Sequence, residues 1–147
     1  MSSAQTASVN EISPALLVDA MFAVRKTAAI KAAIELDLFT VIGTGQTTKA
    51  AASEMRCAER GVRILCDYLV VAGFLSKSGD TYALTPSSAV FLDRHSPAYM
   101  GSAIDFIAAP QMLSLFLTDP AACVRNGGAE GLANLSPDNP VWVRFAR

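Results

Sequence analysis

The chain has 147 residues, of which 52% are hydrophobic and 17% are charged, and its formal net charge is −1 at neutral pH. A typical globular domain is about 25% charged, so this composition predicts that part of the apolar surface is covered by another subunit. The near-neutral charge disfavours binding to nucleic acid, and no apolar stretch reaches the roughly 20 residues of a membrane-spanning helix.

The beginning of the chain predicts a polar leader followed by an unusually apolar helix. We expect residues 1–12 to be disordered, and they lack the basic and apolar segments of a secretory signal. The helix begins near Ser13, the N-cap, with Pro14 at the first helical position. Over Ala15–Val24 it is apolar on nearly every side, so it has to be covered all round. Either the core of its own subunit or a second copy provides that cover; we favour the second copy, with an interface made by Leu16, Leu17, Met21, Phe22 and Val24.

Residues 27 to 85 predict a winged helix-turn-helix. Val62, Cys66 and Leu69 are spaced to lie on one face of the third predicted helix. Gly43 and Gly45 end the first one. The predicted elements are helices over Thr27–Leu38, Thr48–Met55 and Glu59–Ala72, and a hairpin whose strands, Phe74–Lys77 and Thr81–Thr85, flank a turn at residues 78–80.

Such a unit usually indicates DNA binding, with its third helix in the major groove. Residues 46–93, however, carry five Lys or Arg and five Asp or Glu, so the unit is neutral. Arg60, Arg63 and Asp67 lie on the outer face of the third helix, where Arg63 and Asp67 are spaced to pair. Phosphate binding by the two arginines is an alternative that Glu59 and Asp67 oppose. We therefore expect the unit to make protein contacts.

The last part of the chain predicts further helices and an incomplete one. Pro86 opens a short helix through Leu92, and longer helices are predicted over Pro97–Ala108 and Gln111–Asn126. The glycines of residues 127–131 lack the spacing of a phosphate-binding loop and indicate a helix end and a linker. Asn139 and Pro140 then begin a helix in which the sequence stops. We expect a domain over residues 13–126, with residues 127–147 leading towards a missing further domain.

The sequence predicts no catalytic, cofactor-binding or metal-binding residue. Its single histidine, His95, excludes a metal site built from several histidines and is expected in a surface loop. Cys57, Cys66 and Cys123 form no CxxC pair and are expected to be free thiols in a reducing cytoplasm. A group of apolar residues belongs either to the core or to the wall of a ligand pocket: Phe106, Ile107, Met112, Leu113, Phe116, Trp142 and Phe145.

Four segments, taken in order, resemble a known family. They are KAAIELDLF (Lys31–Phe39), GVRILCDYLVVAGFL (Gly61–Leu75), YALTP (Tyr82–Pro86) and DNPVWVRFAR (Asp138–Arg147). From about Pro14 onward the chain resembles the N-terminal winged-helix dimerisation domain of S-adenosylmethionine-dependent O-methyltransferases from plant and bacterial small-molecule pathways. The resemblance implies a mainly α fold, a winged helix-turn-helix with a small β-hairpin plus additional helices, intertwined with a second copy as a homodimer.

The resemblance also implies what this segment lacks. In that family a Rossmann-type domain with an Asp-x-Gly-x-Gly-x-Gly loop binds S-adenosylmethionine, and this sequence does not contain that loop. S-adenosylmethionine is thus the implied cofactor of the intact cytoplasmic enzyme, while this segment alone is expected to bind none and to be inactive. The family forms part of the pocket for a small aromatic or polyketide-like acceptor from residues that match Ile107, Ala108, Leu113, Trp142 and Phe145, with a partner-subunit wall around Phe22–Val24.

Two other functions stay open from the sequence. One is a winged-helix transcriptional regulator that binds DNA, and the other is a stand-alone interaction module. Neither nucleic acid nor a membrane is an expected partner in the favoured interpretation.

Overall fold

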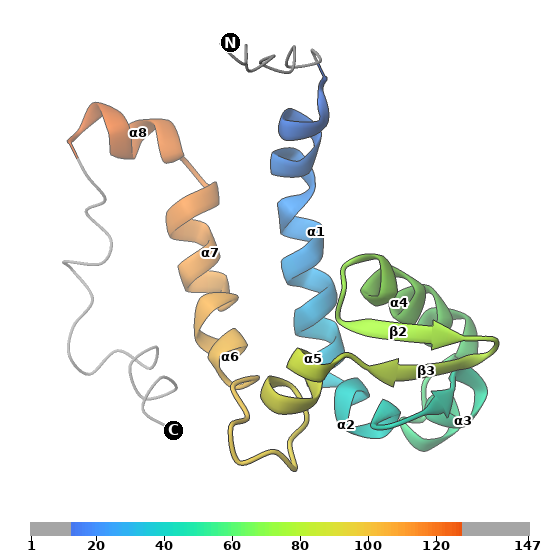
Figure 1. The fold of residues 1–147 in the computed structure, drawn as a ribbon. Coiled ribbons are helices and arrows are strands. Elements are labelled where there is room, and N and C mark those ends of the chain that lie inside the picture. The colour runs from blue at the N-terminus through green and yellow to red at the C-terminus, as the bar shows by residue number, and fades with distance from the viewer. Residues whose placement is uncertain (1–12, 128–147) are drawn as a thin grey trace, which may run out of the picture.

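The computed structural model describes residues 13–127, which form helices around one small sheet (Figure 1). The predicted mainly α, winged-helix fold class is confirmed. In chain order the elements are α1 (Ala15–Glu35), α2 (Leu38–Ile42), β1 (Gln46–Thr47), α3 (Thr48–Glu54), α4 (Glu59–Val71), β2 (Leu75–Ser78), β3 (Thr81–Leu84), α5 (Pro86–Phe91), α6 (Ala103–Ile107), α7 (Pro110–Leu117) and α8 (Pro120–Arg125).

The sheet is the wing of the winged helix and has three antiparallel strands in the order β1-β3-β2. β2 and β3 pair with Ser78 opposite Thr81, which leaves Gly79 and Asp80 in the turn. Gly79 has a φ of 58°, a conformation that glycine adopts without steric cost. The sequence did not predict β1, because a strand of two residues is too short to show an alternating pattern.

The core lies where the winged helix meets the C-terminal part of α1. On α4, the predicted inner face is confirmed, since Val62, Cys66 and Leu69 are buried. Thr47 caps α3 by accepting a hydrogen bond from the backbone N–H of Ala50 at 3.3 Å. The buried cluster contains Ala33, Ile34, Leu38, Phe39, Ile42, Ala51, Ala52, Val62, Cys66, Leu69, Leu75 and Tyr82.

The two helical stretches predicted before residue 38 are one continuous helix, α1, which ends at Glu35. The predicted end at Leu38 is wrong because Asp37 takes a left-handed conformation with a φ of 58°. Aspartate is among the few residues that visit this region routinely, and there it breaks the helix. Leu38 therefore begins α2 and points into the core, where it is fully buried.

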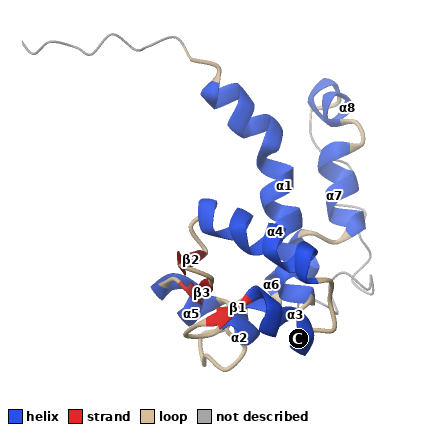
Figure 2. Cartoon of the chain, turned by 90° about the vertical axis from the view of Figure 1, so that its right-hand side faces the viewer, coloured by secondary structure: helices blue, strands red, loops and turns tan. Residues whose placement is uncertain are grey.

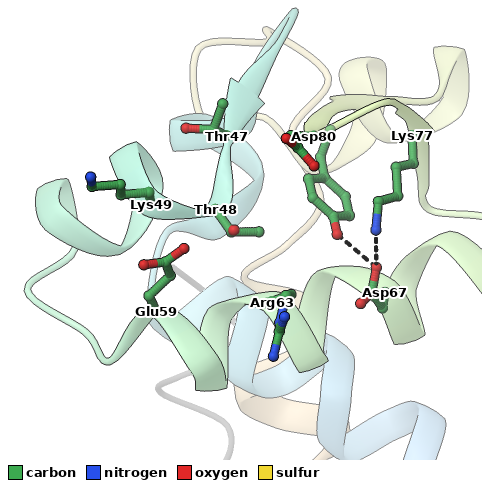
Figure 3. A pocket seen from close by; sticks show the side chains of 9 residues that line it. Thr47, Thr48, Lys49, Glu59, Arg63, Asp67, Lys77 and Asp80 are labelled. Carbon is green, nitrogen blue, oxygen red and sulfur yellow. Dashed lines mark hydrogen bonds and ion pairs between the residues drawn. The ribbon is translucent and has the colours of Figure 1, made fainter.

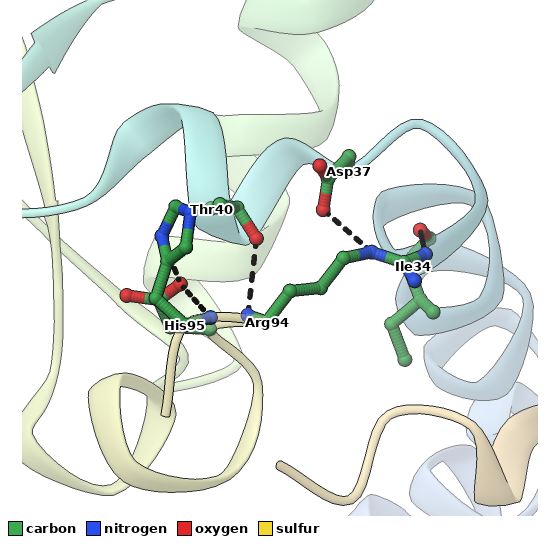
Figure 4. Close-up of polar contacts among 6 residues, drawn as sticks. Ile34, Asp37, Thr40, Arg94 and His95 are labelled. Carbon is green, nitrogen blue, oxygen red and sulfur yellow. Dashed lines mark hydrogen bonds and ion pairs between the residues drawn. The ribbon is translucent and has the colours of Figure 1, made fainter. Parts of the chain in front are cut away.

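Arg94 ties the segment after α5 to the corner between α1 and α2 (Figure 4). Its Nε donates to Oδ1 of Asp37 at 2.8 Å, and its Nη2 donates to the carbonyl oxygen of Ile34 at 3.3 Å. Its backbone N–H donates to Oγ1 of Thr40 at 3.2 Å. The carbonyl oxygen of Ile34 also accepts from the backbone N–H of Asp37 at 3.1 Å, so the guanidinium is its second donor, placed where a cation favours the C-terminal end of a helix.

Two predictions for the region after the wing are wrong. Within the expected helix over residues 97–108, only α6 is helical, and turns and irregular backbone precede it. The expected helix over residues 111–126 is split into α7 and α8 at Asp119, whose side chain accepts from the N–H of Ala122 at 2.9 Å. Pro120 disfavours a helical conformation for Asp119 and lacks the N–H that a continuous helix would use.

The N-terminal half of α1 and the α7–α8 segment both extend away from the winged helix (Figures 1 and 2). α6 packs against α1, and α7 continues from α6. Ala109 and Met112 form a second small buried cluster, against which Phe106 packs.

Candidate functional site

The N-terminal half of α1 is an exposed apolar surface in the single chain. Every residue from Ser13 to Lys26 is exposed. The five residues predicted for a subunit interface are among them, from Phe22 at 45% exposed to Leu16 at 85%. The guanidinium of Arg25 lies 4.2 Å from the centre of the Phe22 ring and covers one of its faces. Burying a large apolar side chain contributes about 1.5–3 kcal/mol, so this surface favours being covered.

A polar pocket of about 520 Å³ lies between the first turns of α3, the outer side of α4 and the wing (Figure 3). Three of its lining residues are cationic and three are anionic, which makes the pocket neutral. It is lined by Thr47, Thr48, Lys49, Glu59, Arg63, Asp67, Lys77, Asp80 and Tyr82.

Asp67 is the centre of the contacts in this pocket. Nζ of Lys77 lies 2.7 Å from its Oδ1, and the hydroxyl of Tyr82 donates to the same oxygen at 2.6 Å. The predicted pairing of Asp67 with Arg63 is therefore wrong: the wing supplies both donors that bind the carboxylate. Lys77 and Tyr82, ten and fifteen positions from Asp67, bind its carboxylate in place of Arg63 on the same helix.

These contacts shift the pKa values of Asp67, Lys77 and Tyr82. The hydrogen bond from Lys77, and then that from Tyr82, lowers the pKa of Asp67, and the hydrogen bond to Asp67 raises the pKa of Lys77. Burial, more than the contact with Asp67, raises the pKa of Tyr82. Lys77 is the single lysine or arginine of residues 75–84. The cation of the wing is thus bound within the chain rather than presented to a phosphate.

The outward face of α4 carries a feature that the sequence reasoning missed. Ile64, Tyr68 and Val71 are exposed on the side opposite the core. Their spacing of four and three residues places them in one stripe, and this spacing was the signal that could have revealed it. In a winged helix that binds DNA, this face of the third helix meets the base pairs. Here Ile64, Tyr68 and Val71 make part of that face apolar, beside the exposed charged residues Arg60 and Arg63.

The residues predicted for an acceptor pocket lie at the end of α6 and in α7, as far as they are described. Ile107 is exposed, Ala108 is buried and Leu113 is partly buried. Ile107 and Ala108 adjoin the small cluster of Ala109 and Met112. Trp142 and Phe145 lie outside the described residues, as do the predicted leader and nearly all of the predicted linker.

The titratable side chains of residues 13–127 do not gather into a metal site: no three His, Cys, Asp or Glu residues are close enough to share an ion. His95 is exposed in a turn, as predicted, with Nδ1 3.3 Å from Oδ1 of Asp93. Cys66 is buried, and burial raises the pKa of its thiol to about 11. Within the same range, none of the helices has the length and apolarity to cross a membrane.

Comparison with known proteins points to one family. The O-methyltransferase dimerisation domain matches residues 18–94. A search of curated proteins gave no match. Among solved structures, the chain is similar to a protein of Nostoc punctiforme PCC 73102 assigned to the O-methyltransferases, with a TM-score of 0.84 and 45% identity over 92% of this chain and 42% of that one.

Two more distant structures share the fold. A methyltransferase of calicheamicin biosynthesis, in its SAH-bound form, has a TM-score of 0.74 and 17% identity over 95% of this chain and 44% of that one. Human N-acetylserotonin methyltransferase, in complex with SAM, has a TM-score of 0.66 and 22% identity over 83% of this chain and 37% of that one. The chain therefore spans less than half the length of each of these three proteins.

Proposed function

This chain belongs to the O-methyltransferase dimerisation domain family, and we propose that it forms the dimerisation half of an S-adenosylmethionine-dependent O-methyltransferase acting on a small molecule. The observation that carries the proposal is the exposed apolar half of α1 in a chain that matches a dimerisation domain over residues 18–94. The similarity to longer methyltransferases supports the presence of a further domain in the intact enzyme.

In this proposal the N-terminal half of α1 binds a second copy of the chain. A helix that is apolar on every side is stable in water only where other groups surround it. The interface residues are Leu16, Leu17, Met21, Phe22 and Val24, all exposed in the single chain. α7 and α8 also expose apolar side chains, Leu117 and Val124, and extend on the same side as the free half of α1. In an intertwined homodimer, the N-terminal half of α1 and the helices α7 and α8 of one copy would be buried against those of the other.

The proposed role in catalysis is to position the acceptor. S-adenosylmethionine, which a further domain would hold, would supply the methyl group as its S–CH3 bond breaks, and the acceptor hydroxyl would give up its proton. Ile107, Ala108, Leu113, Trp142 and Phe145 would form an apolar wall against a small aromatic or polyketide-like acceptor. Correct orientation of two reactants is worth up to roughly 7–11 kcal/mol of the barrier. The segment alone is proposed to bind no S-adenosylmethionine and to be inactive.

Sedimentation equilibrium of the 147-residue chain tests the dimer. We expect a dimer at micromolar concentration and a shift towards monomer in Leu17→Lys and Met21→Lys, because each places a charge within the proposed interface. Val90→Lys is the matched control, since Val90 is also an exposed apolar residue of a helix, 44% exposed on α5. A monomeric wild-type chain at this concentration would contradict the proposal.

Calorimetric titration with S-adenosylmethionine tests the proposal that this chain alone does not bind the cofactor. We expect no heat of binding from this chain, and micromolar affinity would mean that the cofactor site lies within it. The transcriptional regulator is not supported, because Asp67 binds Lys77 of the wing and exposed apolar residues occupy part of the outward face of α4. A gel shift on duplex DNA at low salt checks this, and clear binding with a steep salt dependence would restore that alternative.

A further inference from the structure

The polar pocket beside the wing contains a buried hydroxyl that the protein itself does not use. Thr48, the first residue of α3, lines this pocket and is only 8% exposed. Within residues 13–127 its side chain forms no hydrogen bond, whereas the hydroxyl of the adjacent Thr47 accepts from Ala50. No polar side-chain atom of that range is both sealed off and unpaired, so the Thr48 hydroxyl is open to the pocket (Figure 3). Buried polar groups nearly always have a partner, and this one is left for a bound molecule.

Four charged side chains of the same pocket are also unbonded. Lys49 and Arg63 are cations, Glu59 and Asp80 are anions, and all four are exposed. The ion pairs among the described residues are formed by other side chains. Glu59 and Arg63 lie one turn apart on α4, a spacing at which opposite charges often pair, yet they do not. Single exposed charges are ordinary on a protein surface, but here four of them line one pocket together with a buried hydroxyl.

The side of the pocket next to the wing is fixed before any ligand arrives. Oδ1 of Asp67 accepts from Lys77 at 2.7 Å and from Tyr82 at 2.6 Å, so α4 and the wing are joined across the pocket. Arg63 lies near enough to lower the pKa of Asp67 but does not bond to it. A ligand that enters a pre-formed pocket avoids the entropic cost of ordering it. The guanidinium of Arg63 is therefore available beside a pocket that already has its shape.

Size and charge indicate the class of ligand. The volume of about 520 Å³ is typical of small-molecule pockets, and the lining is polar. An anion such as phosphate would pair with Arg63 but would also meet Glu59 and Asp80, and a simple cation would meet the two free cations. A zwitterion satisfies both signs, because its carboxylate accepts parallel hydrogen bonds from a guanidinium and its ammonium donates to a carboxylate. In an α-amino acid these two groups are attached to one carbon, which suits Glu59 and Arg63 on neighbouring turns of α4.

We propose that the pocket between α3, α4 and the wing binds a free α-amino acid. Its carboxylate binds Arg63, its ammonium binds Glu59, and the hydroxyl of Thr48 forms a hydrogen bond with one of these two groups. The inference does not rest on the proposed function, because neither the dimer surface of α1 nor the acceptor wall contains a residue of this pocket. A ligand held there joins α3 to α4 and should raise the thermal stability of the chain.

Nuclear magnetic resonance titration of the 147-residue chain with the common L-amino acids tests the inference. We expect shifts in the backbone signals of α3, α4 and the wing, with a dissociation constant below about 1 mM for the best ligand. The N-acetyl derivative of that amino acid lacks the ammonium and its amide lacks the carboxylate, so each should bind at least about tenfold more weakly. The inference is overturned if no amino acid binds below about 10 mM, or if inorganic phosphate binds more tightly than all of them.

Charge-removing variants locate the binding. Arg63→Gln and Glu59→Gln each remove one charge of the pocket and should weaken the best ligand by about tenfold. Arg60→Gln and Glu54→Gln are the matched controls, because both residues are exposed on the same two helices but do not line the pocket. They should leave the dissociation constant unchanged, and circular dichroism checks that all four variants are folded. Equal weakening by Arg63→Gln and Arg60→Gln would indicate non-specific attraction and would overturn the inference.

Thr48→Val separates a ligand-binding role of the hydroxyl from a structural one. Valine keeps nearly the shape of threonine and removes only the hydroxyl. Because that hydroxyl has no partner within the described chain, the melting temperature without ligand should stay unchanged or rise, whereas the affinity for the amino acid should fall several-fold. A less stable free chain with unchanged affinity would overturn the assignment of Thr48 to the site. Sedimentation decides the dimer through α1 separately, so failure of these binding tests leaves that proposal standing.

Discussion

Replacement of Arg94 by alanine should loosen the attachment of the α5–α8 half to the winged helix. The ion pair with Asp37 joins side chains that are 50% and 46% exposed, so it contributes at most about 1 kcal/mol. The hydrogen bond to the carbonyl oxygen of Ile34 adds about 0.5–1.5 kcal/mol. The guanidinium also lies 5.5 Å from the centre of the Tyr99 ring, a minor contact at an exposed site. We expect a total loss of about 1–2 kcal/mol in the free energy of unfolding.

Urea denaturation at a fixed protein concentration measures this loss, because the stability of a dimer depends on the concentration. A double-mutant cycle with Asp37→Asn isolates the ion pair. Asparagine also tolerates the left-handed conformation at position 37, so this variant removes the charge without straining the backbone. We expect a coupling energy of about 0.5 kcal/mol between positions 37 and 94.

Arg94→Lys provides the matched control. Lysine keeps the charge but is a single point charge, so it cannot reach Asp37 and the carbonyl of Ile34 with separate nitrogen atoms. It should recover only part of the stability that Arg94→Ala loses. Full recovery, or a loss below about 0.3 kcal/mol in Arg94→Ala, would refute the view that the forked contact holds this corner together.

Three further predictions concern the core and the pocket. Leu38→Ala should lower the free energy of unfolding by about 2–5 kcal/mol in urea, because Leu38 is fully buried; a loss below about 1 kcal/mol would contradict its place in the core. Burial raises the pKa of Cys66 to about 11. The stabilisation by its neutral thiol is therefore complete below the ordinary pKa of about 9 and is lost as the pH rises through 11. Between pH 8 and 11, the melting temperature of Cys66→Ala should fall less steeply with pH than that of the wild type. The pKa of Asp67 is lowered, so its contribution to stability is present above its ordinary pKa and is lost as the pH falls through the pKa of the folded state. In Asp67→Asn, the free energy of unfolding should therefore fall less steeply with pH in the acid range. An unchanged acid dependence would contradict the contacts with Lys77 and Tyr82.

The winged helix could be predicted from sequence because its signals are local. In α4, the buried positions recur at helical spacing, and the wing strands are separated by a turn that contains glycine. The apolar character of α1 predicted a covered helix, and the structure shows that the rest of the described chain leaves its N-terminal half uncovered. These features depend on neighbours within a few positions, so a pattern along the chain contains the information.

The errors occurred where contacts between distant residues, or a single backbone conformation, decide the outcome. The spacing on α4 suggested that Arg63 pairs with Asp67, whereas Lys77 and Tyr82 reach the carboxylate from the wing. The left-handed conformation of one residue, Asp37, divides α1 from α2. On α4 the exposed apolar residues Ile64, Tyr68 and Val71 alternate with the charged residues Arg60, Arg63 and Asp67, so the sequence shows no uniform apolar stripe there.

The contacts of Asp67 suggest how a fold that often reads DNA can serve another purpose. A DNA-binding winged helix needs cations that are free to neutralise phosphates, on the third helix and on the wing. Here Asp67 lies on α4 at the point that faces the wing and binds Lys77, so the same contact removes a cation and fastens the wing to the helix. Ile64, Tyr68 and Val71 also make part of the outward face of α4 apolar. Both changes lower the affinity for a polyanion and raise that for an apolar surface, because phosphate binding depends on free charge and subunit association on buried apolar area. The neutrality of the unit and the exposed apolar residues of α4 are therefore both consistent with the proposed protein contacts.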